Sequence, residues 1–343
     1  MSPTSAECGG SKWRLDDGGH DSNIAEHPSP IVLLSSSRFE KAVLLSAERR
    51  PMSSFMVPFP THRPSFRSLA LLAFSLWMAA IAVQADDPAP VRSIFADARL
   101  ESAVRQQVFA KRWTNSPLTA EDVLHVATVN ANGQGITNLS GLEYCRELAS
   151  ADLAGNQIMD LSPISGLRQL QYLNLATNHI QELAPLATNG AIQYLELSHN
   201  HITDFSPLRG LSNLANLYLG YNAVRSLNPA TNFHRLVSLY LEHNQLTSVA
   251  GLEQIPSVNS LSVAHNRVAD LTPLQALQSP TFLFLENNDF QDISPLDASL
   301  RKDLAGAKRF SPFVHIYVGH NPWNAASREL IKKGKSDGFR YHE

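Results

Sequence analysis

Residues 192–211 read IQYLELSHNHITDFSPLRGL, and they are the clearest copy of a pattern that runs through most of the chain. Apolar residues lie eight, five and three positions before Asn200 and two, five, eight and eleven positions after it. Asparagines in this frame recur every 22 residues, at Asn156, Asn178, Asn200, Asn222, Asn244, Asn266 and Asn288. A period this regular predicts a solenoid of stacked coils.

The alternation of Leu195 and Leu197 places two side chains on one face of a short strand, and stacked strands can bury that face. The asparagine amide offers two donors and an acceptor to backbone groups of the following turn. We therefore expect the asparagines to be structural. A single coil buries too little apolar surface to be stable, so each coil needs its neighbours.

The frame resembles the leucine-rich repeat. The Asp-Leu-Ser-Pro and Asp-Phe-Ser-Pro stretches at 160–163 and 204–207 make the resemblance specific to one subclass of this repeat. They are similar to the 22-residue subclass of bacterial internalin-type proteins and of the eukaryotic Sds22-type phosphatase regulator. The resemblance implies an α/β solenoid, a right-handed superhelix with a parallel β-sheet on its concave face. It also implies helical caps at both ends.

The pattern loosens at each end of the array. Gln134 takes the asparagine position one coil before Asn156, although the surrounding frame persists. Asn321 follows Asn288 by 33 residues, which predicts a final coil with an 11-residue insertion and a helix near 297–308. We count about nine coils and place the solenoid at 126–323.

Caps are expected beyond both ends. Helical spacing over 94–110 involves Phe95, Leu100, Val104 and Val108, and Thr119 with Asp122 resembles a capping box, so we assign 86–125 to an N-terminal cap. For the C-terminal cap, 324–343, Asn324 and Gly334 are expected to bound a helix, with Phe339 and Tyr341 in a final extended stretch.

The first 85 residues lie outside the repeat pattern. Arg63 and Arg67 precede an apolar run at 69–83, which is short for a membrane span, and small residues then lead to Ala85. We interpret 56–85 as a cleavable signal peptide ending at Ala85, and 1–55 as a mis-assigned start or a disordered leader. The predicted location is secreted, periplasmic or on the cell envelope. The alternative is a disordered tail followed by a membrane anchor.

Charge and cysteine content fit an exported binding module. Residues 86–343 contain 20 lysines and arginines against 24 acids, so nothing indicates a nucleic-acid partner. Once the leader is removed, Cys145 is the single cysteine, at a core position, which predicts no internal disulfide. We expect no cofactor, no metal and no membrane span after signal cleavage.

Candidate binding residues lie at the outward positions of the strands, six, four, two and one residues before each asparagine. From these positions we select as candidates Tyr172, Tyr194, Glu196, His199, Tyr218, Tyr221, Tyr240, Glu242, His243, His265, Phe282, Phe284 and Tyr317. Tyrosine combines a large contact area with a polar tip at low entropic cost, which favours a binding surface. The competing interpretation is that aromatic residues are good strand formers that stabilise one another from strand to strand.

His243 and His265 occupy equivalent positions in adjacent coils, and Glu242 precedes the first. A metal ion or a pH-sensitive contact is conceivable there. A solvated polar ladder is the favoured interpretation, so no metal ligand is assigned.

The sequence favours recognition over catalysis. Gly334, Lys335 and Ser336 imitate the end of a phosphate-binding loop, but Glu329 occupies the place of the leading glycine. We predict a non-enzymatic module that binds a protein, or a glycan, through its concave face. A phosphatase regulatory subunit and a passive structural envelope protein are the alternatives.

Overall fold

The computed structural model describes residues 92–227, 233–311 and 313–343. The expectations for the leader and the signal peptide, residues 1–85, lie outside this part of the chain, as does the start of the N-terminal cap.

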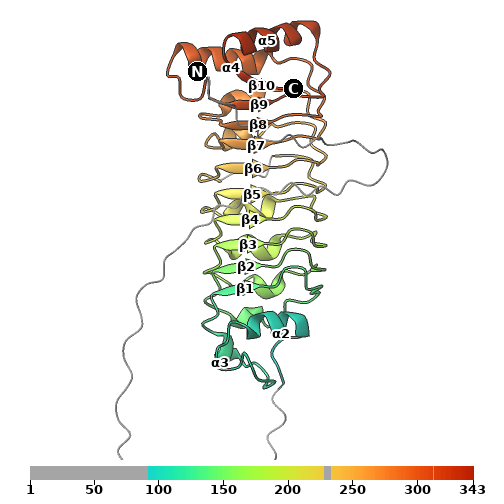
Figure 1. The fold of residues 1–343 in the computed structure, drawn as a ribbon, viewed down its shortest axis with the longest axis vertical. Helices are drawn as coiled ribbons and strands as arrows, with labels where there is room; N and C mark the ends of the chain where they lie inside the picture. The colour runs from blue at the N-terminus through green and yellow to red at the C-terminus, as the bar shows by residue number, and fades with distance from the viewer. Residues whose placement is uncertain (1–91, 228–232, 312) are drawn as a thin grey trace, which may run out of the picture. The chain divides into compact units, whose positions relative to one another are not determined.

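The described residues form one sheet of ten parallel strands in which each strand pairs with the next along the chain, as Figure 1 shows. The strands are β1 (Thr128–Asn130), β2 (Ser150–Asp152), β3 (Tyr172–Asn174), β4 (Tyr194–Glu196), β5 (Asn216–Tyr218), β6 (Ser238–Tyr240), β7 (Ser260–Ser262), β8 (Phe282–Phe284), β9 (His315–Tyr317) and β10 (Arg340–His342). Strands β1 to β9 come from the nine predicted coils. The predicted α/β solenoid is therefore confirmed.

Register follows the 22-residue period. Leu173, Leu195 and Leu217 pair across β3, β4 and β5, and each is fully buried. The flanking residues of these strands point to the other face, because side chains alternate along a strand. We call that other face the outer sheet face.

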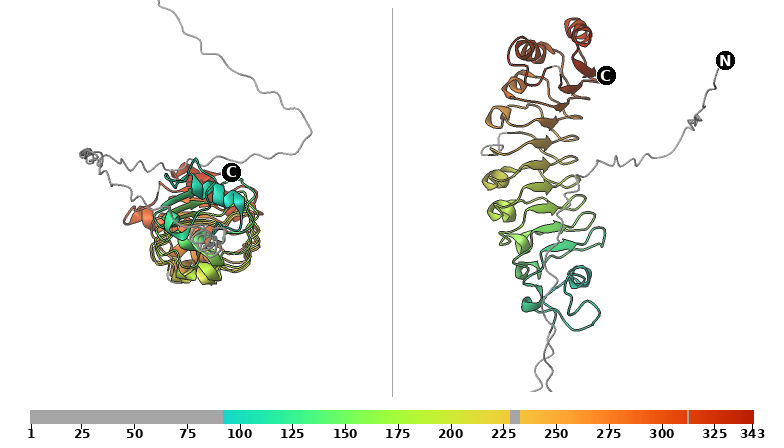
Figure 2. Two further views of the ribbon diagram at one scale, coloured as in Figure 1. Left: turned by 90° about the horizontal axis from the view of Figure 1, so that it is seen from below. Right: turned by 60° about the vertical axis from the view of Figure 1, so that its left-hand side comes forward.

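Short helical turns form the side of the coils opposite the strands (Figure 2). They are η1 (Leu142–Tyr144), η2 (Ser162–Ile164), η3 (Ala184–Thr188), η4 (Ser206–Gly210), η5 (Leu252–Gln254) and η6 (Thr272–Ala276). Four of them have proline in their first turn, where its fixed backbone angle favours a helical start and its missing N–H costs nothing. These prolines thus mark the helical turns through which the chain returns toward the next strand.

The asparagine side chains hold adjacent coils together as well as closing turns. Asn178 Oδ1 accepts from the backbone N–H of Ile158 at 3.0 Å, and its Nδ2 donates to the carbonyl oxygens of Leu153 and Leu175, each at 3.0 Å. The same arrangement recurs from Asn156 to Asn288. Each amide therefore links its own turn to the preceding coil.

Asn189 departs from the apolar frame and is fully buried. Its Nδ2 donates to the carbonyl oxygens of Ile164 at 2.9 Å and Leu167 at 3.0 Å, both in the preceding coil. An asparagine at a position that the frame gives to an apolar residue is thus a second link between coils.

The N-terminal cap is less helical than expected. Helix α2 covers only Ala98–Arg105, because the Asp97 side chain accepts from the Arg99 N–H and begins the helix there. Phe95 and Val108 are nevertheless buried on either side of it. A Cβ at Gly141 would lie 2.4 Å from the Phe95 ring, so this glycine makes room for the ring that closes the first coil.

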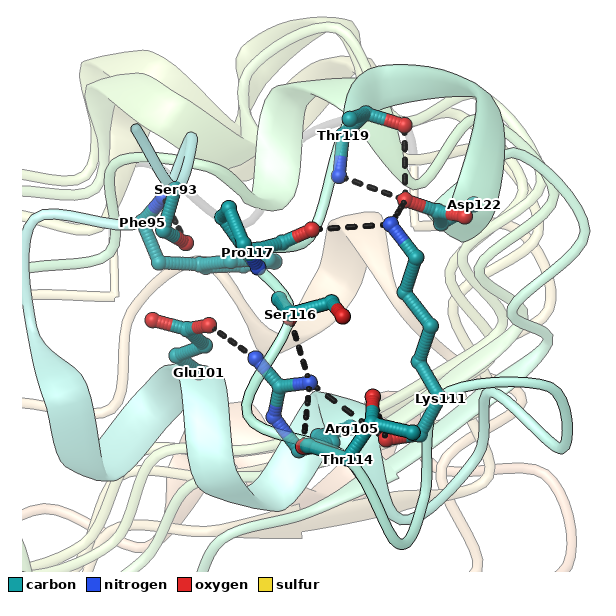
Figure 3. A network of polar contacts seen from close by, with 10 residues as sticks. All are labelled: Ser93, Phe95, Glu101, Arg105, Lys111, Thr114, Ser116, Pro117, Thr119 and Asp122. Carbon is teal, nitrogen blue, oxygen red and sulfur yellow. Dashed lines mark hydrogen bonds and ion pairs between the residues drawn. The ribbon is translucent and has the colours of Figure 1, made fainter. Parts of the chain in front are cut away.

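A polar network joins the pieces of this cap (Figure 3). The Thr119 N–H donates to Asp122 Oδ2 at 2.7 Å at the start of α3 (Ala120–Val123), as the capping box predicted. Lys111 Nζ contacts the same oxygen at 2.6 Å and the carbonyl oxygen of Pro117 at 2.8 Å. Arg105 donates to the carbonyl oxygen of Ser116 at 2.8 Å and pairs with Glu101.

The C-terminal end contains helices α4 (Ser294–Ala305) and α5 (Ala325–Ser336), followed by β10. Helix α4 begins and ends three residues before the predicted 297–308, and Asn324 caps α5 as expected. Gly334 does not end that helix. It lies inside α5, where its lack of a side chain leaves room for the Tyr341 ring, since a Cβ at this position would approach that ring to 2.6 Å.

Cys145 is fully buried, and burial raises the pKa of its thiol to about 12, with Glu143 contributing. Within the part of the chain that the structure describes, no helix is long and apolar enough to cross a membrane.

Candidate functional site

The candidate site is the outer sheet face, where aromatic rings form a track from strand to strand. The ring centroids of Tyr172 and Tyr194 are 4.7 Å apart, those of Tyr194 and Tyr218 are 5.3 Å apart, and those of Tyr218 and Tyr240 are 5.0 Å apart. The first two residues open strands β3 and β4, whereas the last two close β5 and β6. The track therefore crosses the face diagonally.

Strand β7 has serines in place of rings on the outer sheet face, and the track crosses it by a contact between rings of the neighbouring strands. Ser260 and Ser262 are both buried although they point outward, because the neighbouring rings cover them. Tyr240 leans across this strand, its hydroxyl 2.8 Å from Ser260 Oγ and its ring 6.2 Å from that of Phe284. Ser260 was assigned no role from the sequence, because nothing in the repeat frame marks a serine as the partner of a tyrosine hydroxyl from the preceding coil.

Beyond β7 the track continues to the last strand. Phe284 stacks on Tyr317 at 4.7 Å, and Tyr317 stacks on His342 at 4.4 Å. Beside them Phe282 stacks on His315 at 5.3 Å, and His315 Nδ1 lies 3.1 Å from His342 Nε2. His342 was not among the predicted residues, because β10 had been treated only as a cap.

Arg340 adds a positive charge at this end of the face. Its guanidinium lies 2.8 Å from His315 Nε2. Desolvation and then the charge of Arg340 lower the pKa of His315. The alternation of Arg340 and His342 around the buried Tyr341 could have identified a tenth strand in the sequence.

The predicted histidines form a second, separate row in the turns that follow the strands. His199, Tyr221, His243 and His265 stack in succession, with ring centroids 4.1, 4.1 and 3.9 Å apart. Asn287 Nδ2 extends the row to His265 Nε2 at 3.2 Å. All five residues have positive φ angles between 53° and 57°. The row is thus placed by a left-handed turn and not by the strand itself.

His243 lies in the middle of this row, between Tyr221 and His265. Desolvation lowers its pKa from the ordinary 6.5, and the nearby His265 and His199 lower it further. Within the described residues, no group of three or more histidine, cysteine or acidic side chains could hold a metal ion. The pair of histidines and Glu242 therefore do not form such a group.

Two glutamates of this face each have a carboxylate oxygen without a hydrogen-bond partner; Glu242 was among the predicted residues and Glu286 was not. Glu242 Oε2 and Glu286 Oε2 are buried and have no hydrogen-bond partner. Burial raises the pKa of Glu286 and also that of Glu196, to which the charge of Glu242 contributes. A buried carboxylate oxygen without a hydrogen-bond partner is an energetic cost to the folded chain.

The comparisons with known proteins agree with this architecture. A family model described as leucine-rich repeat matches residues 168–224, and a second, described as two copies of the leucine-rich repeat, matches residues 146–188. No curated protein matches the chain. The chain thus contains leucine-rich repeats within a longer stack of coils.

Solved structures with the same architecture include bacterial proteins. An internalin of Listeria monocytogenes is 23% identical over 76% of this chain and 94% of its own, with a TM-score of 0.53. A leucine-rich repeat protein of Leptospira interrogans is 19% identical over 66% of this chain and 63% of its own, also with a TM-score of 0.53. Internalin C2 of L. monocytogenes is 28% identical over 68% of this chain and 88% of its own, with a TM-score of 0.48. The similarity to the first two of these structures is one of fold.

Proposed function

We propose that this chain is an exported, non-enzymatic recognition module that binds a protein through its outer sheet face. The observation that carries the proposal is the aromatic track, whose rings run from β3 to β10 over a leucine core that is already filled. Aromatic side chains with polar tips dominate the energetics of protein interfaces.

The size of the face supports a protein partner. Nine coils with four outward positions each supply 36 sites. A standard protein interface needs about 20 to 30 residues on each side. A folded domain or an extended segment laid along the track would meet this requirement, whereas a small molecule would use only a fraction of it.

The competing interpretation is that the rings only stabilise one another, since cross-strand aromatic pairs contribute roughly 0.2–1 kcal/mol each. A triple variant, Tyr218→Ala with Tyr240→Ala and Phe284→Ala, separates the two. The full chain and the triple variant are used as bait, and captured proteins are quantified by mass spectrometry. Loss of a specific partner from a variant that remains folded by circular dichroism supports recognition.

A matched variant on another surface controls for indirect effects. Glu182→Ala with Glu329→Ala removes two exposed side chains that lie off the strands. This control should retain the partner. If the triple variant also retained it, or if the wild-type chain captured no specific protein and bound only a glycan on a carbohydrate array, the proposal of a protein ligand would be rejected.

Export rests on the apolar run at 69–83 and the small residues before Asp86. Amino-terminal sequencing of the protein recovered outside the cytoplasm tests it. Asp86 as the first residue supports cleavage, whereas an intact chain held in the membrane refutes it. A cytoplasmic regulator of the Sds22 type would instead keep its leader and co-purify with a phosphatase.

A further inference from the structure

One part of the outer sheet face combines stacked tyrosine rings with carboxylates. We call it the acidic tyrosine cluster, and it comprises Tyr172, Tyr194, Tyr218, Glu196 and Glu242. Glu196 pairs in register with Tyr218 across β4 and β5. The Tyr172 and Tyr194 rings stack with an interplanar angle of 13°, and Tyr218 lies tilted against Tyr194 at 41°. The carboxylates therefore share one surface with the rings.

The negative charge of this cluster has no cationic partner within the described residues. No lysine, arginine or histidine nitrogen there lies within 4.0 Å of the Glu196 or Glu242 carboxylate. Glu196 Oε1 accepts from the Ser198 N–H at 2.8 Å, whereas Glu242 Oε2 is buried and unpaired. Carboxylates that are partly removed from water without a counter-ion destabilise the free protein.

The electrostatic surroundings agree with this geometry. Burial raises the pKa of Tyr218 to about 12, with Tyr240, Glu196 and Glu242 contributing after it. Burial also raises the pKa of Tyr172, to which the charges of Asp152 and Glu196 add. Burial disfavours a charge of either sign, but the contributions of the carboxylates show a negative potential at these rings, which favours a positive group there.

The two ends of the face differ in charge. The acidic tyrosine cluster comes from β3, β4, β5 and the turn that follows β6, whereas Arg340, His315 and His342 lie on β9 and β10. A partner that covers the whole track must therefore place its positive group against the earlier strands. Arginine fits best, because a planar guanidinium can form two parallel hydrogen bonds with a carboxylate, and lysine satisfies the same charge.

We infer that the acidic tyrosine cluster receives an arginine or lysine side chain of the protein ligand, held by the carboxylates of Glu196 and Glu242 beside the stacked tyrosine rings. This inference rests on the proposed recognition function and deepens it. It assigns the chemistry of one contact, which the aromatic track alone does not specify.

The test uses a capped tetraarginine peptide, with a capped tetracitrulline peptide of nearly equal shape and no charge. Binding of each to the full chain is measured by calorimetry at low salt and neutral pH. The variant Glu196→Gln with Glu242→Gln keeps side-chain size and the acceptor for Ser198. The control Glu182→Gln with Glu329→Gln changes the net charge equally at exposed positions away from the strands.

Tetraarginine should bind the wild-type chain and the control alike, and the Glu196/Glu242 variant should bind it at least about tenfold more weakly. Tetracitrulline should not bind. Equal affinity of the Glu196/Glu242 variant and the control, or equal binding of the two peptides, would overturn the inference.

Thermal unfolding of the unbound proteins provides a second readout. The Glu196/Glu242 variant should unfold at the same temperature as the wild type or higher, because two uncompensated carboxylates become neutral. A clear decrease would mean that the carboxylates serve folding and not a ligand. If the partner captured by the wild-type chain is lost from the Tyr218, Tyr240 and Phe284 variant but fully retained by Glu196→Gln with Glu242→Gln, recognition stands and the cationic contact is rejected.

Discussion

The side-chain oxygen of Asn178 lies 3.0 Å from the backbone nitrogen of Ile158, which belongs to the preceding coil. The bond crosses between coils, and it is repeated from coil to coil. The 22-residue spacing of the asparagines is therefore also a rule for how coils stack.

Replacing Asn178 by alanine should lower the free energy of unfolding by about 1–3 kcal/mol, because buried backbone groups in two coils lose their partner. Urea unfolding followed by circular dichroism measures the change. The matched control is Asn216→Ala on the outer sheet face, which should change stability by less than about 0.5 kcal/mol. Equal effects of the two substitutions would contradict a structural role for the ladder.

Replacing Gly334 by alanine should destabilise the C-terminal cap by about 1–3 kcal/mol, because the added methyl group would overlap the Tyr341 ring. An ordinary helical glycine would give the opposite sign, since alanine is the better helix former. Thermal unfolding distinguishes the two outcomes. Gly166→Ala is the control, because a Cβ there meets nothing within 4 Å.

Asp303 should stabilise the chain in a pH-dependent manner. Burial by itself would raise its pKa, but the N–H groups of Ser311, Phe310 and Arg309 outweigh burial and hold it below the ordinary 3.8. The stabilisation is therefore present above pH 3.8 and is lost as the pH falls through the lower pKa of the folded state.

The variant Asp303→Asn isolates this contribution. It should be less stable than the wild type at neutral pH by about 1–3 kcal/mol, because the amide cannot accept all three bonds. The difference should shrink as the pH falls below 3.8. A difference that stays constant across this range would show that the charge of Asp303 is not what matters.

His243 should titrate below 6.5, since desolvation and its neighbours His265 and His199 disfavour its protonation. Because the unfolded chain binds this proton more readily, folding stability should fall as the pH decreases from 6.5 through the lower folded-state pKa. In the variant His265→Asn the pKa of His243 should rise, measured by nuclear magnetic resonance. Asn287 already occupies the same left-handed position in the next coil, so the backbone tolerates the change. Titration of wild-type His243 at or above 6.5 would refute the prediction.

Most of the fold could be predicted from the sequence, because the repeat that predicts each strand also predicts the strand with which it pairs. Leu195 and Leu197 predict a strand locally, and a return of the same frame 22 residues later predicts which strand it pairs with. Errors occurred where the repeat ends, as at Gly334, because there one ring contact outweighs the general tendency of glycine to end a helix.

The candidate site was predicted as a list of outward positions, and the structure divided that list into two arrangements. Tyr194 and Tyr218 belong to one diagonal track on the strands, whereas His243 and His265 belong to a row in the turns. The repeat frame could not separate the two arrangements. The second row depends on a turn with positive φ, and a histidine in the sequence does not predict that backbone angle. Whether these residues bind a ligand stays a prediction.

By itself, the sequence determined the period, the number of coils, the buried leucines and the asparagine ladder, since one spacing rule generates all of them. Only the tertiary structure decided which rings touch, that Ser260 lets Tyr240 reach across β7, and that Arg340 and His342 add a tenth strand to the face. It also left Glu196 and Glu242 without a cation in the described part of the chain. These contacts depend on side-chain sizes and directions in neighbouring coils, which no repeat frame specifies.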